Sequence, residues 1–300
     1  MKAPFGGSSG NLHVDHRYGL ALQLVEWGDL QAAADLLTDT LPLAPLWPPI
    51  HFYLGDVCRR LGHSEDSEKH FLNYLALDPE DIMGAGIKLS LMGCYDPQQA
   101  MSRTYVTSLF DQYAAHFESS LVQKLDYHTP DIMAAFLPKE RYGRVLDLGC
   151  GTGLMGVAIK GRFEELNGID VSARMIAQAK LKGLYNMLMV ADIEEHLSAT
   201  LDMYDLVTAA DVFVYAGALE KIFIAVSSHL NPGGQFIMSV QNTDTDGWVL
   251  GDDHRYAHSF SYVERCAHGA GMIARGSEKT HIRLDAGKPV AGKIVLCEKP

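Results

Sequence analysis

The segment from Val145 to Gly156 restricts the possible folds of this chain more than any other. An apolar run, Val145-Leu146-Asp147-Leu148, carries one carboxylate and is followed at once by glycines at positions 149, 151 and 153. When a buried strand leads into such a glycine-rich turn, the backbone can bend tightly beneath a ligand. The segment therefore predicts an α/β fold whose first strand ends at a ligand site.

Short runs rich in Val, Ile and Leu alternate with helical segments over the rest of the chain. These runs are Arg144–Leu148, Leu166–Asp170, Met187–Ala191, Tyr204–Ala209 and Gln235–Val240. Such alternation is typical of a parallel sheet with helices on both faces. Two last runs, His281–Asp285 and Lys293–Cys297, are too close for a crossover helix and predict an antiparallel hairpin. We expect a seven-stranded, Rossmann-like α/β domain, mostly parallel, that ends in this hairpin.

The first hundred residues contain an internal repeat. Gly28 and Gly62 lie 34 residues apart, and so do Pro45 and Pro79. Glycine is favoured where a helix ends in a left-handed residue, and proline cannot continue a helix. The matching residues of the two copies are Ala21 with Gly55, Ala33 with Ser67, and Leu37 with Phe71. The spacing predicts two consecutive helix pairs with small residues where the helices touch.

This repeat resembles the tetratricopeptide repeat, read from Tyr18 to Asp81, with Ile82–Gly93 as a partial third unit and closing helix. The tryptophan expected near the start of each first helix is replaced by Arg17 and His51. An ordinary helical bundle is the alternative. The resemblance implies a small all-α domain over residues 12–94.

Two further acids follow predicted strands. Asp170 ends the second run, and Asp192 follows the third. A carboxylate at the end of the second strand can accept both hydroxyls of a ribose. Gly151 to Gly156 also spells the GxGxxG pattern of dinucleotide sites, so NAD is the alternative ligand. Asp147 argues against NAD, because a site for pyrophosphate has no use for an acid just ahead of the glycines.

The glycine segment, the strand-end acids and the terminal hairpin together resemble the class I S-adenosylmethionine-dependent methyltransferases. The resemblance implies that Asp147 helps to hold the methionine ammonium, Asp170 the ribose and Asp192 the adenine amino group. It also implies S-adenosylmethionine as the cofactor and S-adenosylhomocysteine (SAH) as its product. The cofactor-binding residues that it implies are Tyr105, Tyr113, Asp147, Gly149, Gly151, Leu154, Asp170, Val171, Met175, Asp192, Ile193, Ala209 and Ala210.

An aromatic segment, Tyr105–Phe117, precedes the sheet and resembles the FDxYAxxF lid of small-molecule methyltransferases. The resemblance implies lid helices over residues 105–140, at the start of a methyltransferase domain over residues 105–300. Tyr105 or Tyr113 would reach the methionine end of the cofactor. A plain core-facing stripe of Phe110, Tyr113 and Phe117 also fits, and this alternative stays open. The weakly periodic stretch Tyr95–Arg103 is the predicted boundary between the two domains.

Candidates for contact with the methyl acceptor follow the fourth and fifth strands. Asp211 and Tyr215 come directly after the fourth run, where open α/β sheets bind ligands. His254 and His258 lie in the polar stretch Gln241–Ser261, predicted as a loop, and imidazole titrates in the range of a general base. No metal site is expected, because these residues lack ligand spacing on a predicted helix. The catalytic residue is left open among these four, since alignment of the acceptor with a sulfonium supplies much of the acceleration by itself.

Composition bears on partners and location. The formal net charge is −12 and no basic patch stands out, which argues against nucleic acid as a partner. No run reaches the roughly 18 apolar residues of a membrane span, and the start lacks the apolar core of a signal peptide. The five cysteines form no CxxC pair. We therefore expect a cytoplasmic protein that binds neither nucleic acid nor membrane.

Taken whole, the chain resembles a bacterial family of predicted methyltransferases fused to tetratricopeptide repeats. The favoured function is methyl transfer from S-adenosylmethionine to a small-molecule acceptor, by O- or N-methylation. One alternative is a protein or peptide methyltransferase that recruits its substrate through the repeat region. Another is a non-catalytic interaction protein that retains cofactor binding. The oligomeric state is not fixed by the sequence, and a dimer is compatible with it, as is a protein partner of the repeat region.

Overall fold

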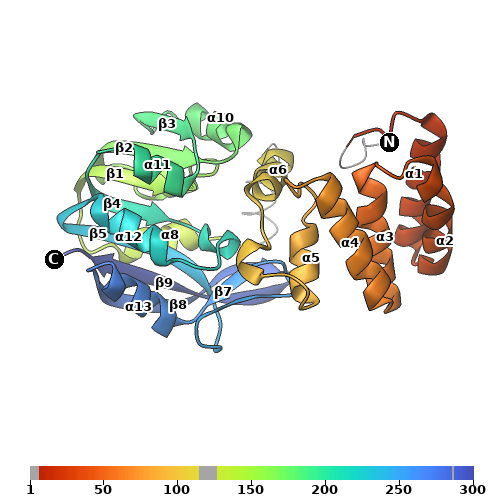
Figure 1. Cartoon of the computed structure of the whole chain (residues 1–300). Helices are drawn as coiled ribbons and strands as arrows, with labels where there is room; N and C mark the ends of the chain where they lie inside the picture. The colour runs from red at the N-terminus through yellow and green to blue at the C-terminus, as the bar shows by residue number, and fades with distance from the viewer. Residues whose placement is uncertain (1–6, 115–126, 286) are drawn as a thin grey trace. The chain divides into compact units, whose positions relative to one another are not determined.

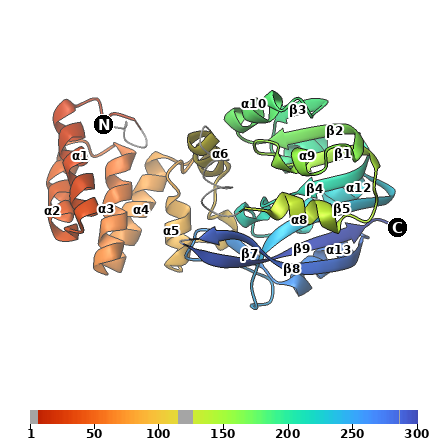
Figure 2. The same cartoon turned by 180° about the vertical axis from the view of Figure 1, so that it is seen from behind.

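The chain folds into two compact units. The computed structural model describes residues 7–114, 127–285 and 287–300, and Figures 1 and 2 show it from opposite sides. The first unit comprises Met1–Tyr105 and the second Val106–Pro300. The division therefore falls shortly after the predicted boundary segment.

The described part of the N-terminal unit is helical. Its elements are α1 (Leu12–Trp27), α2 (Leu30–Thr40), η1 (Leu41–Leu43), α3 (Pro48–Leu61), α4 (Ser64–Leu77), α5 (Ala85–Leu91) and η2 (Pro97–Gln99). Helix α1 packs on α2, and α3 packs on α4. The two predicted helix pairs are thus present, and α5 follows them as the expected closing helix.

The same helix end recurs in the two pairs. Gly28 ends α1 and Gly62 ends α3, each with a φ of 83°. In both, the next amide closes the turn: Asp29 N lies 2.9 Å from the Leu24 carbonyl oxygen, and His63 N lies 2.9 Å from that of Cys58. This is the bonding of a left-handed helix end, which glycine adopts without the steric cost of a Cβ. The 34-residue repeat is therefore a repeat of local structure.

Small residues bring the paired helices together. At Gly55 in α3, an ideal Cβ would lie 2.8 Å from the Phe71 ring of α4. The Ser67 hydroxyl of α4 donates to the Gly55 carbonyl at 2.8 Å. The matching residues of the first pair, Ala21 and Ala33, are both fully buried. Small residues therefore lie at the helix contact of the second pair, and those of the first pair lie in its core.

Strands and helices alternate in the second unit. Its strands are β1 (Tyr142–Leu148), β2 (Phe163–Asp170), β3 (Met187–Val190), β4 (Tyr204–Ala209), β5 (Leu230–Asn242), β6 (Trp248–Leu250), β7 (Tyr256–His258), β8 (Ile273–Asp285) and β9 (Lys288–Glu298). Its helices are α6 (Arg103–Tyr113), which begins just ahead of the division, α8 (Thr129–Phe136), α9 (Leu154–Ala158), α10 (Ala173–Leu181), α11 (Ile193–Ala199), η4 (Phe213–Tyr215), α12 (Glu220–Ser228) and α13 (Phe260–Gly269). Among all the helices described, none is both long and apolar enough to cross a bilayer.

The strands form one mostly parallel sheet. Strands β3, β2, β1, β4 and β5 are neighbours in that order and run parallel. Strand β9 pairs antiparallel with β5, and β8 pairs antiparallel with β9. The five predicted parallel strands and the antiparallel terminal hairpin are therefore present. Chain order reverses between β1 and β4, which makes their carboxyl ends the switch point where open α/β sheets bind ligands.

Among the described residues, the sheet has nine strands rather than the seven predicted. The two additional strands, β6 and β7, lie within Gln241–Ser261, which was predicted to be a loop. They form because β5 extends to Asn242 and offers its last residues as a pairing edge: Gln241 and Asn242 pair with Ala257 and His258. Strand β6 then pairs with β7. Strands of three residues are too short for an alternating pattern to reveal.

Apolar residues of the strands alternate between two cores. On β5, Phe236 and Met238 belong to one core, whereas Ile237 belongs to the other. Residues of α11, α12 and α13 complete the first core, and residues of α8 and α9 complete the second. Figures 1 and 2 show these helix layers on opposite faces of the sheet. Both faces are thus covered, as a parallel sheet requires.

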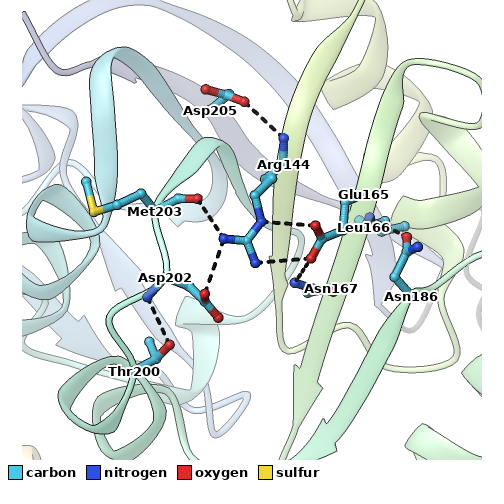
Figure 3. Close-up of polar contacts among 9 residues, drawn as sticks. All are labelled: Arg144, Glu165, Leu166, Asn167, Asn186, Thr200, Asp202, Met203 and Asp205. Atoms are coloured by element: carbon cyan, nitrogen blue, oxygen red, sulfur yellow. Dashed lines mark hydrogen bonds and ion pairs between the residues drawn. The ribbon is translucent and has the colours of Figure 1, made fainter.

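The amino ends of the central strands are joined by charges (Figure 3). Arg144 on β1 bonds Glu165 on β2 through two nitrogens, Nε and one terminal nitrogen, each at 3.1 Å. Its other terminal nitrogen lies 3.2 Å from Asp202, just before β4. The Arg144 guanidinium also stacks 5.3 Å from the centre of the Tyr204 ring. One planar side chain therefore links three neighbouring strands at the edge opposite the switch point.

Candidate active site

Glycines shape the turn between β1 and α9. Gly149, Gly151 and Gly153 all have positive φ values, of 59°, 53° and 88°. An ideal Cβ on Gly149 would lie 2.7 Å from the Val212 side chain that follows β4. Three left-handed residues in five positions demand glycine, because other residues adopt this conformation only at a cost. The turn therefore presents bare backbone at the switch point, as predicted.

Asp147 lies at the end of β1 and is almost completely buried. The Tyr185 hydroxyl donates to its Oδ2 and the Thr208 hydroxyl donates to its Oδ1, each at 2.7 Å. Burial raises the pKa of Asp147 to about 6, and the charge of Asp170 adds to this, while the two hydroxyl bonds oppose it. A buried carboxylate in this state is well suited to meet a cation, because a cation would offset its loss of water.

Asp170 lies at the end of β2 and is also buried. Its Oδ2 accepts the Gly151 amide and its Oδ1 accepts the Ser172 amide, both at 2.8 Å. Burial raises the pKa of Asp170, while these two amide bonds lower it. Because each carboxylate oxygen has a second lone pair, a carboxylate fixed in this way can still accept ligand hydroxyls.

The third strand-end acid begins a helix. Asp192 caps α11, where its Oδ1 accepts the amides of Glu194 at 2.9 Å and Glu195 at 3.2 Å. Asp192 and the next residue, Ile193, are half-buried. Of two other residues in the predicted cofactor-binding set, Met175 is fully buried in α10 and Val171 is half-buried. The predicted residues thus follow the ends of β2 and β3, with α10 between them.

Helix α6 contacts the ends of two strands. The Asp111 carboxylate accepts the Ser172 hydroxyl at 2.5 Å, and the Asp111 carbonyl accepts the Arg174 guanidinium at 3.1 Å. The Phe110 ring meets the Tyr215 ring edge-on at 5.1 Å. Helix α6 therefore reaches from the turn after β2 to the turn after β4, across the switch point between them.

The two tyrosines predicted for the lid lie near the two ends of α6. Tyr113 is at its end and is 55% exposed. Tyr105 is in the N-terminal unit, where its ring would lie 2.8 Å from a Cβ on Gly84. Phe117, the last residue of the predicted motif, lies outside the described residues. The structure thus shows Phe110 and Asp111 of the motif against the strand ends.

The turn after β4 holds Asp211 in a left-handed conformation, with φ at 59°. Its amide donates to the Ser239 hydroxyl at 2.7 Å. Arg283 of β8, only 3% exposed, pairs with Asp211 at 3.2 Å and donates to the Gln241 side chain at 2.8 Å. The two small residues before it, Ala209 and Ala210, are buried and half-buried. Left-handed backbone at a non-glycine residue is often found at functional sites.

Tyr215 and Tyr127 belong to the same polar region as Asp211. Arg255 donates to the Tyr215 hydroxyl at 3.1 Å and lies 5.4 Å from the centre of its ring. Burial raises the pKa of Tyr215, and Arg255 opposes that rise. Burial also raises the pKa of Tyr127, and the charges of Asp211 and Asp147 add to it. Both phenols are therefore neutral donors at physiological pH.

The two candidate histidines differ in their surroundings. His258, on β7, is completely buried, with Nε2 2.9 Å from the Gly217 carbonyl oxygen, and its ring stacks on Tyr262. Burial lowers the pKa of His258, so the ring is neutral. His254 is half-buried in the turn between β6 and β7, with φ at 59°. No cluster of three or more acidic, histidine or cysteine residues in the described ranges is arranged to hold a metal.

Sequence reasoning missed four polar residues of this region: Asp111, Tyr185, Thr208 and Arg283. Asp111 stands inside the recognised lid motif, and its acid could have been assigned a role there. Arg283 is a charged residue within a predicted strand, which signals a buried partner. No local signal marks Tyr185 or Thr208, because their role follows from contacts with Asp147 across the sheet.

The comparisons with known proteins agree with this geometry. Residues 145–234 match the sequence model of a family described as "Methyltransferase domain". The ubiquinone biosynthesis O-methyltransferase of Sodalis glossinidius is 29% identical over 110 residues, which are 35% of this chain and 44% of that protein. The malonyl-[acyl-carrier protein] O-methyltransferase of Enterobacter lignolyticus is 27% identical over 160 residues, 52% of this chain and 62% of that protein. The chain thus spans about half the length of these relatives.

A solved structure shows the same fold. The magnesium protoporphyrin IX methyltransferase of Synechocystis PCC 6803, crystallised with bound SAH, superposes with a TM-score of 0.53 at 17% identity. The match covers 66% of this chain and 99% of that one. Residues 145–234 thus resemble a methyltransferase domain in sequence, and the second unit has the Rossmann-like fold of this solved methyltransferase.

Proposed function

We propose that this protein binds S-adenosylmethionine at the carboxyl ends of β1, β2 and β3 and transfers its methyl group to a small-molecule acceptor. One observation carries the proposal: two buried carboxylates, Asp147 and Asp170, flank a turn of three left-handed glycines at the switch point of the sheet. The donor set fits the cofactor, which presents an ammonium and two ribose hydroxyls and therefore needs anionic acceptors beside open backbone.

Each part of the cofactor has a counterpart among the strand ends. Asp147 would accept the methionine ammonium, Asp170 the ribose hydroxyls, and Asp192 the adenine amino group. The remaining residues proposed to contact the cofactor are Gly149, Gly151 and Leu154 of the turn and α9, Val171, Met175 and Ile193 around the adenine, Ala209 and Ala210 beside the methionine, and Tyr113 on α6.

When bound, S-adenosylmethionine supplies an electrophilic methyl group, and an acceptor aligned with it gains much of the rate enhancement. Helix α6 would cover the cofactor edge, held by the bonds of Asp111 to Ser172 and Arg174. Asp211 and Tyr215 are the residues we place against the acceptor. Because Arg283 keeps Asp211 oriented by a buried ion pair, Asp211 can accept a hydrogen bond from the attacking group.

A small-molecule acceptor is favoured because the first relative described above is named for methyl transfer in ubiquinone biosynthesis. One observation supports a second candidate, a protein or peptide acceptor. The repeated helix pairs and their matching glycine ends are what a tetratricopeptide-like domain over residues 12–94 would show, and such arrays offer surfaces for peptides.

Calorimetric titration with S-adenosylmethionine and SAH tests the proposal. The wild-type protein should bind both, and Asp170→Ala should weaken binding about 10- to 100-fold, as expected for lost bonds to a charged group. Asp131→Ala, which removes an exposed carboxylate on α8, is the matched control and should bind as the wild type does. Absence of binding, or equal binding by Asp170→Ala, contradicts the proposal.

The acceptor class requires a second measurement. A bacterial extract incubated with the protein and methyl-labelled S-adenosylmethionine is separated into small molecules and proteins. Label in the small-molecule fraction that is lost with Asp147→Asn supports the favoured function. Label confined to the protein fraction supports the second candidate instead.

A further inference from the structure

Tyr185 lies under the glycine turn, between α10 and β3, and belongs to none of the motifs found in the sequence. Its ring fills a space left by three glycines. An ideal Cβ would lie 3.0 Å from Tyr185 at Gly153, 2.7 Å from it at Gly156 and 2.8 Å from it at Gly168. These glycines come from the turn, α9 and β2. The half-buried ring therefore packs against the elements that surround the end of β1.

The Tyr185 hydroxyl links this packed ring to the Asp147 carboxylate. It donates to Asp147 Oδ2 at 2.7 Å. Thr208 donates to the other carboxylate oxygen from β4, directly beside Asp147 in the sheet. A carboxylate has about four lone-pair sites, so two stay available after these bonds. The two hydroxyls thus fix the plane of the carboxylate and leave part of it for a ligand.

We propose that Tyr185 is a positioning residue for the cofactor: its ring, packed against three glycines, and its hydroxyl hold the Asp147 carboxylate in the orientation that meets the methionine ammonium. This inference rests on the proposed function, because the ammonium belongs to S-adenosylmethionine. The glycines then have a second purpose. Gly153, Gly156 and Gly168 are small so that a tyrosine can stand beneath the turn.

The bond also favours the ionised form of Asp147. Burial raises the pKa of Asp147 and the Tyr185 bond lowers it, and the net value is about 6. Among the described residues, other titratable groups near Asp147 include Asp170 on β2, Cys150 in the turn and Tyr127. Burial raises the pKa values of Cys150 and Tyr127, so both stay protonated near neutral pH. Loss of the Tyr185 hydroxyl should therefore move the titration of Asp147 to higher pH.

The test is SAH affinity, measured by calorimetry from pH 5 to pH 7. Tyr185→Phe removes only the hydroxyl and keeps the ring in its space. The matched control is Tyr142→Phe, which removes a hydroxyl bonded to Gln235 at 2.8 Å, at the other end of the same strand β1. Tyr185→Phe should weaken binding about tenfold or more at pH 7, as for a lost bond to a charged group, and Tyr142→Phe should change it less than about twofold.

Two further readouts separate a positioning role from a merely structural one. In wild type, affinity should rise as pH increases through about 6, the pKa of Asp147, and this rise should move to higher pH in Tyr185→Phe. In an Asp147→Asn background, Tyr185→Phe should have no further effect, since the carboxylate on which it acts is absent.

The outcomes are distinct. Equal affinity of Tyr185→Phe and wild type, or an equal loss in both backgrounds with an unmoved pH profile, overturns the positioning role alone. If wild-type protein does not bind SAH at any pH, the proposed function fails and this inference fails with it. Circular dichroism at each pH verifies that every variant is folded, and the double-variant cycle still decides if Tyr185→Phe is less stable.

Discussion

Asp147→Asn is expected to stabilise the ligand-free protein while it weakens cofactor binding. The pKa of Asp147 rises from 3.8 to about 6 on folding, chiefly through burial. Such a carboxyl binds its proton more tightly in the folded than in the unfolded chain, so its ionised form opposes folding. The rise of about two pKa units corresponds to about 3 kcal/mol of lost folding stability, which is present above pH 6 and absent below pH 4.

The asparagine keeps the shape of the side chain and cannot ionise. Its carbonyl oxygen can still accept one of the two hydroxyls that bond Asp147, while its amide group must donate to the other. The free energy of unfolding should therefore increase by up to about 3 kcal/mol at pH 8 and change little at pH 4. SAH affinity should decrease at pH 8, because the ammonium loses its counter-charge. The gain in stability and the loss of binding would come from the same atom.

Urea unfolding measured at several pH values between 4 and 8 checks this expectation. The fluorescence of Trp248, in a chain whose Trp27 and Trp47 are replaced by Phe, reports on the second unit alone. Asp131→Asn is the control, since its exposed carboxylate should give a small difference at every pH. A stability difference between Asp147→Asn and its parent that is the same at pH 4 and pH 8 would refute the reasoning. So would a less stable variant at pH 8.

Three other substitutions probe packing and charge. Gly55→Ala should destabilise the N-terminal unit by about 1–3 kcal/mol in thermal unfolding, because the added Cβ would meet an aromatic ring. The control is Gly19→Ala in α1, which has open space around it and should be neutral or stabilising by up to about 1 kcal/mol. Arg283→Met should lower the free energy of unfolding by about 3 kcal/mol, because it leaves Asp211 without its buried partner. Adding Asp211→Asn to this variant should restore part of the lost stability, as measured by urea unfolding. Strictly additive losses from the two substitutions would contradict the pairing. Arg144→Lys should lower the free energy of unfolding by up to about 1 kcal/mol, since the ion pair with Glu165 is partly exposed. High salt should reduce this difference, and a difference that salt leaves unchanged would mean that the ion pair contributes nothing.

The parallel strands, the glycine turn and the terminal hairpin could be predicted because each is encoded within a few neighbouring residues. Val145 to Gly156 contains both a buried strand and the residues that allow its sharp turn. Gly28 and Gly62 similarly mark helix ends by their own conformation. For these elements, local preference and the final fold agree.

Other features depend on contacts that no local pattern contains. Tyr185 reaches Asp147 from 38 positions along the chain, and Thr208 does so only because β4 pairs with β1 in one particular register. The burial of His258 follows from the pairing of β7 with the extended end of β5. In sequence that histidine stands in a polar stretch after the fifth strand, and it was therefore a candidate for a general base.

The charged cluster around Arg144 has a consequence for how this domain can change. Arg144 and Asp147 stand on one strand, yet the first holds the sheet together at its amino edge and the second faces the proposed ligand at its carboxyl edge. The contacts that hold the strands together and the residue proposed to meet the ligand are therefore at opposite ends of one short strand. Turns at the carboxyl edge can be lengthened, shortened or exchanged for a new acceptor while the opposite edge keeps the strands in register. For protein engineering, the Arg144 edge is the part to leave untouched and the turns after β4 and β5 are the part to vary.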